Sequence, residues 1–472
     1  MTENGNYSEL FYQTKNAWES IGETETGEIN GYCTEYAAFL DSSKTEREFT
    51  ANAIAYLEEN GFISLGNALE TGQKLHPGDK VFYDAGNKAL AAAVIGSGEL
   101  KDGINMVGSH IDSPRLDLKP NPLYEDNEVA LMKTHYYGGV RKYQWLSVPL
   151  ALHGVIIRED GARVNVNIGE EDNDPVFVIT DLLPHLASKQ NDKKLGEAFE
   201  GEALNILVGS VPMKHDEIKQ KVKLRVLNLL NNKYKITEKD FINAELEVVP
   251  ALKARDVGLD RGLMGAYGHD DRVCSYAALK ALVDAGIPDK TTLCFLSDKE
   301  EIGSVGKTGA QSDLLEYIVS IILNLATEGA SDLDVKQCLY KSVMLSGDVN
   351  AAFDPAYKTV YDKRNSVFLG KGVGIAKYTG ARGKSGASDA SAELMHGITK
   401  MLDENGIPWQ VGELGKVDAG GGGTIAKFAA KLGIDVVDIG VPLLGMHSPY
   451  EIASKIDIFM CYRAFKSFYK TV

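Results

Sequence analysis

Five places in the chain carry histidine or acidic residues of the kinds that bind metal ions in proteins. These residues are His110 and Asp112, Asp270 and Asp271, Glu300 and Glu301, Asp348, and His447. Mixed ligation by imidazole and carboxylate groups suits zinc, cobalt or manganese, and a catalytic site leaves one coordination position open for water. A single histidine near the end of a strand is more often a hydrogen-bonded structural residue than a ligand. Five such places in one α/β chain favour a metal centre.

The two adjacent glutamates are the most informative of these residues. They follow a β-branched and apolar run, Thr291–Leu296, which is typical of a buried strand, and open α/β sheets bind ligands at the carboxyl ends of their strands. Adjacent carboxylates raise each other's pKa unless a cation lies between them. Neighbouring side chains of an extended segment point in opposite directions, so they can take separate roles. We expect Glu301 to bind a metal and Glu300 to act as a base beside it, although this segment alone also fits a solvated acidic loop.

Asp112 is expected to orient a ligand. The apolar run Ile104–Gly108 predicts a strand that leads directly into Ser109 and His110. A histidine that binds a metal commonly donates its second ring N–H to a carboxylate, which fixes the ring. Asp112, two residues after His110, is well placed to accept this hydrogen bond.

The pattern of apolar residues predicts the elements that position these side chains. Helices are expected at 273–285, 314–325, 390–402, 425–432 and 452–469, and strands at 91–95, 104–108, 291–297, 342–346 and 434–439. Residues 32–60 form a helical pattern in which Ser43–Glu46 resembles a capping box, so one helix or two are equally expected. Alternating helices and strands are typical of a sheet covered on both faces by helices.

The segment from about residue 118 to 252 differs in character from the rest of the chain. Alternating or apolar runs at 163–168, 175–180 and 244–249 predict strands, and a lysine-rich stretch lies at 214–223. This pattern indicates a mostly β insertion. The chain would then have one discontinuous α/β domain, 1–117 and 253–472, interrupted by an inserted domain at 118–252.

Composition limits the classes of protein to which the chain can belong. Its 472 residues suggest two or three domains, and 44% apolar with 25% charged residues is ordinary for a soluble globular protein. A net charge of −16 disfavours binding to nucleic acid and to anionic membranes. No run of about 18 apolar residues predicts a membrane span, and residues 1–7 lack the features of a signal peptide. Five cysteines without C-x-x-C spacing favour reduced thiols in a cytoplasmic enzyme.

Five motifs in the chain resemble those of one known family. In chain order they are Gly108–Pro114, Gly268–Arg272, Asp298–Ser304, Ser346–Val349 and Met446–Pro449. Together they resemble the M18 family of metalloaminopeptidases, which includes aspartyl aminopeptidase, and the resemblance extends to Ala387–Ala390 and Gly420–Thr424. It implies a three-layer α/β/α zinc-peptidase domain with a central mixed sheet. It also implies that the inserted, mostly β domain serves dimerisation and substrate access.

The resemblance implies a role for each site residue. His110 and Asp348 would hold one metal, Glu301 and His447 the other, and Asp270 would bridge them, with Glu300 as general acid/base. Two divalent ions per subunit are expected, Zn²⁺ foremost, with Co²⁺ and Mn²⁺ as alternatives. Three carboxylates and a bridging hydroxide balance the charge of two such ions. The bridging water would be the nucleophile. The peptide bond between Asp270 and Asp271 is expected to be cis, as in structurally related dimetal peptidases.

The resemblance also implies a substrate and an assembly. The substrates would be short peptides that lose their N-terminal residue, with Lys377, or its rival Lys384, contacting an acidic side chain of that residue. Ala351 and Asp354 stand where eukaryotic members carry histidines, which argues against a strict preference for aspartyl substrates. His185 would reach the active site of a neighbouring subunit. Dimers formed through the insert would close into a tetrahedral dodecamer.

Two other functions are compatible with the same residues. One is a related dimetal deacylase or carboxypeptidase, which would need a cationic group for the substrate's terminal carboxylate. The other is a catalytically silent assembly or peptide-binding protein. The intact set of proposed ligands, together with Glu300, argues against the silent protein, because such a protein could lose any of them without harm.

Overall fold

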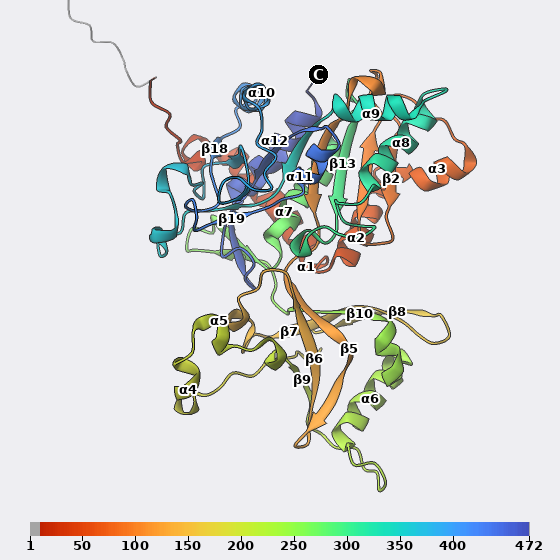
Figure 1. Ribbon diagram of the computed structural model, residues 1–472, viewed down its shortest axis with the longest axis vertical. Coiled ribbons are helices and arrows are strands. Elements are labelled where there is room, and N and C mark those ends of the chain that lie inside the picture. Colours follow the sequence, from red (N-terminus) through yellow and green to blue (C-terminus); the bar gives the residue numbers. More distant parts are fainter. Residues whose placement is uncertain (1–9, 472) are drawn as a thin grey trace, which may run out of the picture.

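The computed structural model describes residues 10–471, which form two parts (Figure 1). Within these residues, the upper part in Figure 1 is built on a nine-stranded mixed sheet and the lower part on a six-stranded antiparallel sheet. The N-terminal residues 1–7, on which the expectation about a signal peptide depends, lie outside this range. None of the helices in it has the length and apolar character needed to cross a membrane.

The nine-stranded sheet has four parallel strands at its centre. Its order is β1 (Ile63–Ser64), β2 (Lys80–Asp84), β3 (Leu90–Val94), β13 (Thr292–Ser297), β4 (Asn105–His110), β14 (Val343–Gly347), β20 (Asp435–Gly440), β16 (Val373–Ala376) and β18 (Trp409–Val411). Strands β13, β4, β14 and β20 run parallel, whereas β3 and β16 pair with this group in the antiparallel direction. The carboxyl ends of β4, β13 and β14 therefore meet at one edge of the sheet.

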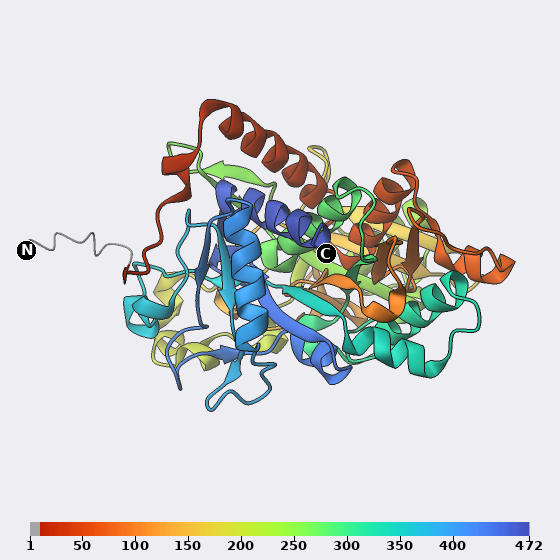
Figure 2. The same ribbon diagram turned by 90° about the horizontal axis from the view of Figure 1, so that it is seen from above.

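Helices cover both faces of this sheet. They are α1 (Glu23–Asp41), α2 (Glu46–Glu59), α3 (Leu65–Thr71), α7 (His269–Asp284), α8 (Leu314–Ala326), α9 (Asp332–Tyr340), α10 (Ala392–Glu404), α11 (Ala426–Lys431) and α12 (Lys455–Tyr469). Val107 of β4 packs with α1, α7 and α12, whereas the adjacent Met106 packs with α8 and α9 on the other face. In Figure 2, α1 lies along the upper side and α8 and α9 along the lower side. The structure thus confirms the expected three-layer α/β/α fold with a central mixed sheet.

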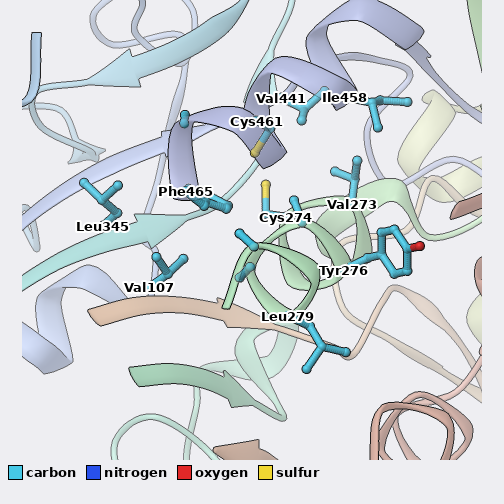
Figure 3. Close-up of a cluster of buried hydrophobic side chains, with 14 of the residues drawn as sticks. Val107, Val273, Cys274, Tyr276, Leu279, Leu345, Val441, Ile458, Cys461 and Phe465 are labelled. Atoms are coloured by element: carbon cyan, nitrogen blue, oxygen red, sulfur yellow. The ribbon is translucent and has the colours of Figure 1, made fainter. Parts of the chain in front are cut away.

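The buried contact between α7, α12 and the sheet contains many apolar side chains. Figure 3 shows Cys274 of α7 and Cys461 of α12 beside Val107 of β4 and Leu345 of β14. All five cysteines lie in the described part of the chain, and each is buried and free there.

The lower part contains two of the three predicted strands, those at 163–168 and 244–249, together with strands and helices that were not predicted. Its sheet has the order β8 (Arg163–Ile168), β7 (Leu150–Ile157), β10 (Ala244–Pro250), β5 (Arg115–Asp126), β6 (Val129–Tyr137) and β9 (Ile206–Gly209). Helix α6 (Lys221–Tyr234) packs on it through Val222 and Val226, and Asn231, Asn232 and Lys233 near its end are exposed. The expected strand at 175–180 is wrong, because only single bridges form at Phe177 and Val178.

The start of the last helix differs from the predicted one. The expected helix at 452–469 begins only at Lys455, because β22 (Glu451–Ser454) pairs with β12 (Leu263–Ala266) and β21 (Pro442–Leu444). These strands belong to a further sheet that also contains β11 (Arg255–Val257) and β15 (Asn350–Ala351).

Residues 32–60, where one helix or two were expected, contain the end of α1 and all of α2.

The capping box of α2 lies two residues later than predicted. Thr45 is the N-cap and Glu48 closes the box, instead of Ser43 and Glu46. The carboxylate of Glu46 is instead fully buried, where it forms ion pairs with Arg115 and Lys88. Glu46 therefore forms ion pairs with distant residues instead of the predicted capping hydrogen bond with Ser43, and sequence spacing does not reveal such distant pairs.

Candidate metal centre

The predicted ligands come together at the carboxyl edge of the central sheet. His110 ends β4, Glu300 and Glu301 lie in the turn η8 (Glu300–Ile302) that follows β13, and Asp348 follows β14. These three strands are parallel neighbours, so their ends converge. Two further predicted ligands join them: Asp270 from the first turn of α7 and His447 from the loop between β21 and β22.

Asp270 lies at the middle of this group. Its Oδ1 is 3.3 Å from Nε2 of His110, and its Oδ2 is 3.1 Å from Nε2 of His447. The same nitrogen of His447 lies 3.5 Å from Oε1 of Glu301. One carboxylate therefore faces a different histidine with each oxygen. The peptide bond between Asp270 and Asp271 is cis, as expected.

The residues fit a divalent metal ion. The ligand atoms of His110, Asp270 and Glu301 all lie within 4.8 Å of one another, and so do those of His110, Asp271 and Asp348. Oε1 of Glu301 is buried and has no hydrogen-bond partner among residues 10–471. An unpaired buried carboxylate oxygen is unfavourable unless a cation or donor satisfies it. Mixed imidazole and carboxylate donors are those that zinc and similar ions accept.

Asp112 orients the ligands from beneath the site. It is fully buried, and Nδ1 of His110 lies 3.0 Å from its backbone carbonyl oxygen and 3.3 Å from its carboxylate. The carboxylate also accepts hydrogen bonds from the backbone N–H groups of Glu300 and Glu301, at 3.1 and 3.2 Å. Burial disfavours its charge, but the interaction with His110 holds the pKa of Asp112 below its usual range. Asp112 therefore connects the end of β4 with the turn after β13.

Sequence reasoning did not identify Glu451 as a site residue. Its buried carboxylate accepts hydrogen bonds from the backbone N–H groups of Asp270, at 3.1 Å, and His447, at 2.7 Å. Burial and the nearby charge of Asp270 raise the pKa of Glu451 to about 8. Its position four residues after His447, at the start of β22, was the signal available in the sequence. Glu451 joins the two ligands that come from outside the central strands.

The electrostatics of the site favour proton transfer near neutral pH. Burial, together with the charges of Asp112 and Asp270, raises the pKa of Glu300 to about 7. Burial opposes a charge on His447, but hydrogen bonding to Asp270 and the charge of Glu301 raise its pKa to about 10. A carboxyl group with a pKa near the working pH is suited to general acid–base catalysis.

A cavity of about 470 Å³ opens from the metal centre. Its lining includes Glu300, Asp348, Lys384, Asp438 and the glycine-rich segment Gly420–Gly423. Within the described residues Lys377, the preferred candidate for substrate contact, does not line this cavity, whereas its rival Lys384 does. The Nζ of Lys384 lies 2.9 Å from Asp389 and 3.8 Å from the centroid of the Tyr378 ring.

His185 lies away from the metal centre of its own chain. It occupies the turn η5 (Pro184–Leu186) in the lower part and is exposed. Of the described residues that line the active-site cavity, none comes from this turn. Its neighbours Leu182, Leu183 and Leu186 are also exposed, at 44%, 48% and 66%.

A three-layer α/β/α fold with histidine and carboxylate ligands at the carboxyl edge of its sheet is typical of metal-dependent hydrolases. The chain matches the family model described as aminopeptidase I zinc metalloprotease (M18) over residues 39–469. It therefore belongs to the M18 family of zinc metalloaminopeptidases and is an enzyme that hydrolyses peptide bonds. The family assignment agrees with the expected activity rather than with a silent scaffold.

Relatives from several bacteria are similar over almost their whole length. The probable M18 family aminopeptidase 1 of Clostridium acetobutylicum is 48% identical over 461 residues, which cover 98% of this chain and 99% of that protein. The crystal structure of the M18 aminopeptidase from Thermotoga maritima superimposes with a TM-score of 0.93 at 46% identity, and covers 98% of this chain and 100% of that one. The S. cerevisiae mApe1 dodecamer, at 21% identity and a TM-score of 0.75, shares the fold.

Proposed function

We propose that the enzyme is a dinuclear aminopeptidase that removes the N-terminal residue from short peptides. The observation that carries the proposal is the carboxylate of Asp270, whose two oxygens face His110 and His447 separately, at 3.3 and 3.1 Å. Such a carboxylate suits a bridge between two ions. Two bound divalent cations would acidify a water molecule, polarise the scissile carbonyl group and bind the free α-amine of the substrate.

In this proposal each side chain has one task. His110 and Asp348 hold the first ion, Glu301 and His447 hold the second, and Zn²⁺ is the expected metal. Glu300 lies 4.0 Å from Nε2 of His110, so it is beside the ligands. It would accept a proton from water and pass it to the leaving amine, and its pKa of about 7 suits both steps.

For the substrate side chain we propose contact with Lys384, and Lys377 is the less favoured candidate. Support comes from the cationic groups of Arg382, Lys384 and Lys416 in the cavity lining. These cations favour an acidic N-terminal residue. The lining also includes the buried carboxylate of Asp438, so the preference for acidic residues would not be strict.

For the assembly we propose that residues 118–252 act as a dimerisation domain inserted into the catalytic domain 1–117 and 253–472. Support comes from the separate apolar core of the lower sheet and from the exposed leucines around His185. His185 would then reach the active site of a partner subunit. Six such dimers would form a tetrahedral dodecamer, and S. cerevisiae mApe1, which shares the fold, is described as a dodecamer.

The test uses a panel of fluorogenic aminoacyl substrates after chelation and reloading with Zn²⁺, Co²⁺ or Mn²⁺. Matched peptides with an acetylated N-terminus or an amidated C-terminus separate the functions. We expect chelation to abolish activity, reloading to restore it and acetylation to block it, while amidation has little effect. Hydrolysis of the acetylated peptide would contradict the proposal and would favour a deacylase or carboxypeptidase.

A further inference from the structure

The lower sheet touches the metal centre through the end of one strand. Strand β6 ends at Tyr137, and Gly138 and Gly139 follow it. Each of these three residues contacts a different part of the site. None of them has a side chain of the kinds that usually bind zinc, so the sequence gave no reason to connect them with the metal centre.

Tyr137 holds the carboxylate that orients His110. Its hydroxyl group donates a hydrogen bond of 2.9 Å to Oδ2 of Asp112. The tyrosine is 8% exposed, and the guanidinium group of Arg115 lies 3.9 Å from the centroid of its ring. Arg115 is itself fixed by Glu247, at 3.2 Å, so the hydroxyl group has little freedom to move. Without this hydroxyl group, Oδ2 of the buried Asp112 would keep only the N–H of Glu301.

The two glycines lie against the ligands of the second proposed ion. A Cβ atom on Gly138 would lie 3.2 Å from both Cβ and Oε2 of Glu301, and its φ of +75° is strained for other residues. A Cβ atom on Gly139 would lie 2.9 Å from Nδ1 of His447. A side chain at either position would displace a ligand.

The carbonyl oxygen of Gly139 also lies 3.3 Å from Nδ1 of His447. A backbone carbonyl accepts hydrogen bonds and cannot donate them, so Nδ1 must carry the proton when this bond forms. The lone pair of His447 is then on Nε2, the nitrogen that faces Asp270 and Glu301. Gly139 thus selects the tautomer that a metal ion requires.

We propose that Tyr137–Gly139 is a positioning element of the metal centre, supplied by the lower sheet of the same chain. This inference rests on the ligand roles proposed above. The insert then acts on the chemistry in two ways: through Asp112 on the side of His110, and through the two glycines on the side of Glu301 and His447. Its contribution does not depend on a partner subunit, unlike that of His185.

The test compares Tyr137→Phe and Gly139→Ala with two matched controls. Tyr462→Phe removes a hydroxyl group that donates to Asp284 at 2.8 Å, and Gly209→Ala places a Cβ atom 2.8 Å from Val226. Zn²⁺ affinity is measured by competition with a chromophoric chelator, and ligand geometry from the absorption spectrum of the Co²⁺ form. We expect a 10- to 100-fold loss of Zn²⁺ affinity in the first two variants and an altered Co²⁺ spectrum in Gly139→Ala. The controls should stay within about twofold of the original protein.

Unchanged affinity and an unchanged Co²⁺ spectrum in both variants would overturn the inference, and so would equal losses in the controls. If Tyr137→Phe does not fold, Gly139→Ala decides alone, because its backbone angles suit alanine and its contact is with one ring. A different result is expected if the proposed metal-ligand roles themselves are wrong. In that case His110→Ala and Asp270→Ala would also leave Zn²⁺ affinity unchanged.

Discussion

Oδ2 of Asp270 lies 3.1 Å from Nε2 of His447, and its Oδ1 faces His110 on the other side. Asp270 lies in the first turn of α7, whereas His447 belongs to a loop near the C-terminus, so the contact joins two distant segments of the chain. Glu451 maintains this arrangement by accepting the backbone N–H of both residues. The carboxylate is therefore held at a fixed place between the two histidines.

The first prediction follows from this position. We expect Asp270→Ala to lose both metal ions, because the carboxylate would be shared between them. Elemental analysis of the purified protein gives the number of ions per subunit, with the exposed Asp126→Ala as control. Two ions retained in Asp270→Ala would refute the bridging role.

Glu300→Gln tests the catalytic base. An amide group has nearly the size of a carboxylate but cannot accept the proton, so we expect metal content and substrate binding to persist. Turnover should fall by about 10²–10⁴-fold, the usual contribution of general acid–base catalysis. Glu59→Gln, an exposed change in α2, is the control. Near-normal turnover in Glu300→Gln would mean that another group is the base.

The meeting of the proposed metal ligands could be predicted because each belongs to a motif at the end of a strand or in an adjoining loop. His110 and Glu301 stand at the ends of apolar runs, so their meeting follows from the rule that parallel strands end at one edge. The supporting residues could not be predicted in this way. Glu451 and Tyr137 act through contacts between segments that are far apart in the sequence, and such contacts leave no periodic pattern.

The fold was predictable to a similar extent and for similar reasons. Buried parallel strands such as β13 are mainly apolar runs, and long helices such as α8 show a clear apolar face. The strand β22 was missed because its pairing with β12 and β21 outweighs the helical pattern that continues into α12. Helix α6 was missed because its many lysines and asparagines hid a narrow apolar stripe.

Glu46 gives a prediction about stability. Its buried carboxylate lies 3.0 Å from Lys88 and 3.3 Å from Arg115, so it connects α2 with the first strand of the lower sheet. Replacing it by glutamine removes the buried charge that faces both cations, and leaves Arg115 with Glu247 and Lys88 with Glu245. We expect Glu46→Gln to lower the free energy of unfolding by about 3–5 kcal/mol. In Glu245→Gln, a half-exposed partner of Lys88, the loss should stay below about 1 kcal/mol.

Denaturant unfolding monitored by circular dichroism compares these two variants with the original protein. The difference between the buried and the half-exposed carboxylate is the decisive result. Equal midpoints for Glu46→Gln and Glu245→Gln would mean that the buried ion pairs do not hold the two parts together.

Lys384 gives a prediction about specificity. Lys384 lines the active-site cavity, whereas Lys377 does not. We expect Lys384→Ala to reduce kcat/KM for substrates with an N-terminal Asp or Glu by about tenfold relative to those with Leu. Lys377→Ala is the matched control and should leave the ratio unchanged. An equal ratio in Lys384→Ala and the original protein would exclude Lys384 from substrate recognition.

The last prediction concerns assembly. His185 is exposed in its own chain, beside Leu182, Leu183 and Leu186, and a patch of exposed leucines is typical of a surface that another subunit covers. If the insert forms dimers and the dimers a closed shell, light scattering should give a mass near twelve times that of the chain. His185→Ala should keep that mass and lower turnover by about tenfold or more, because its side chain would act in the partner's site. Lys189→Ala, an exposed change in the neighbouring helix α4 (Ser188–Asn191), is the control. A fully active dimer at all concentrations, in which His185→Ala behaves like the original protein, would contradict both the closed shell and the histidine that acts across the interface.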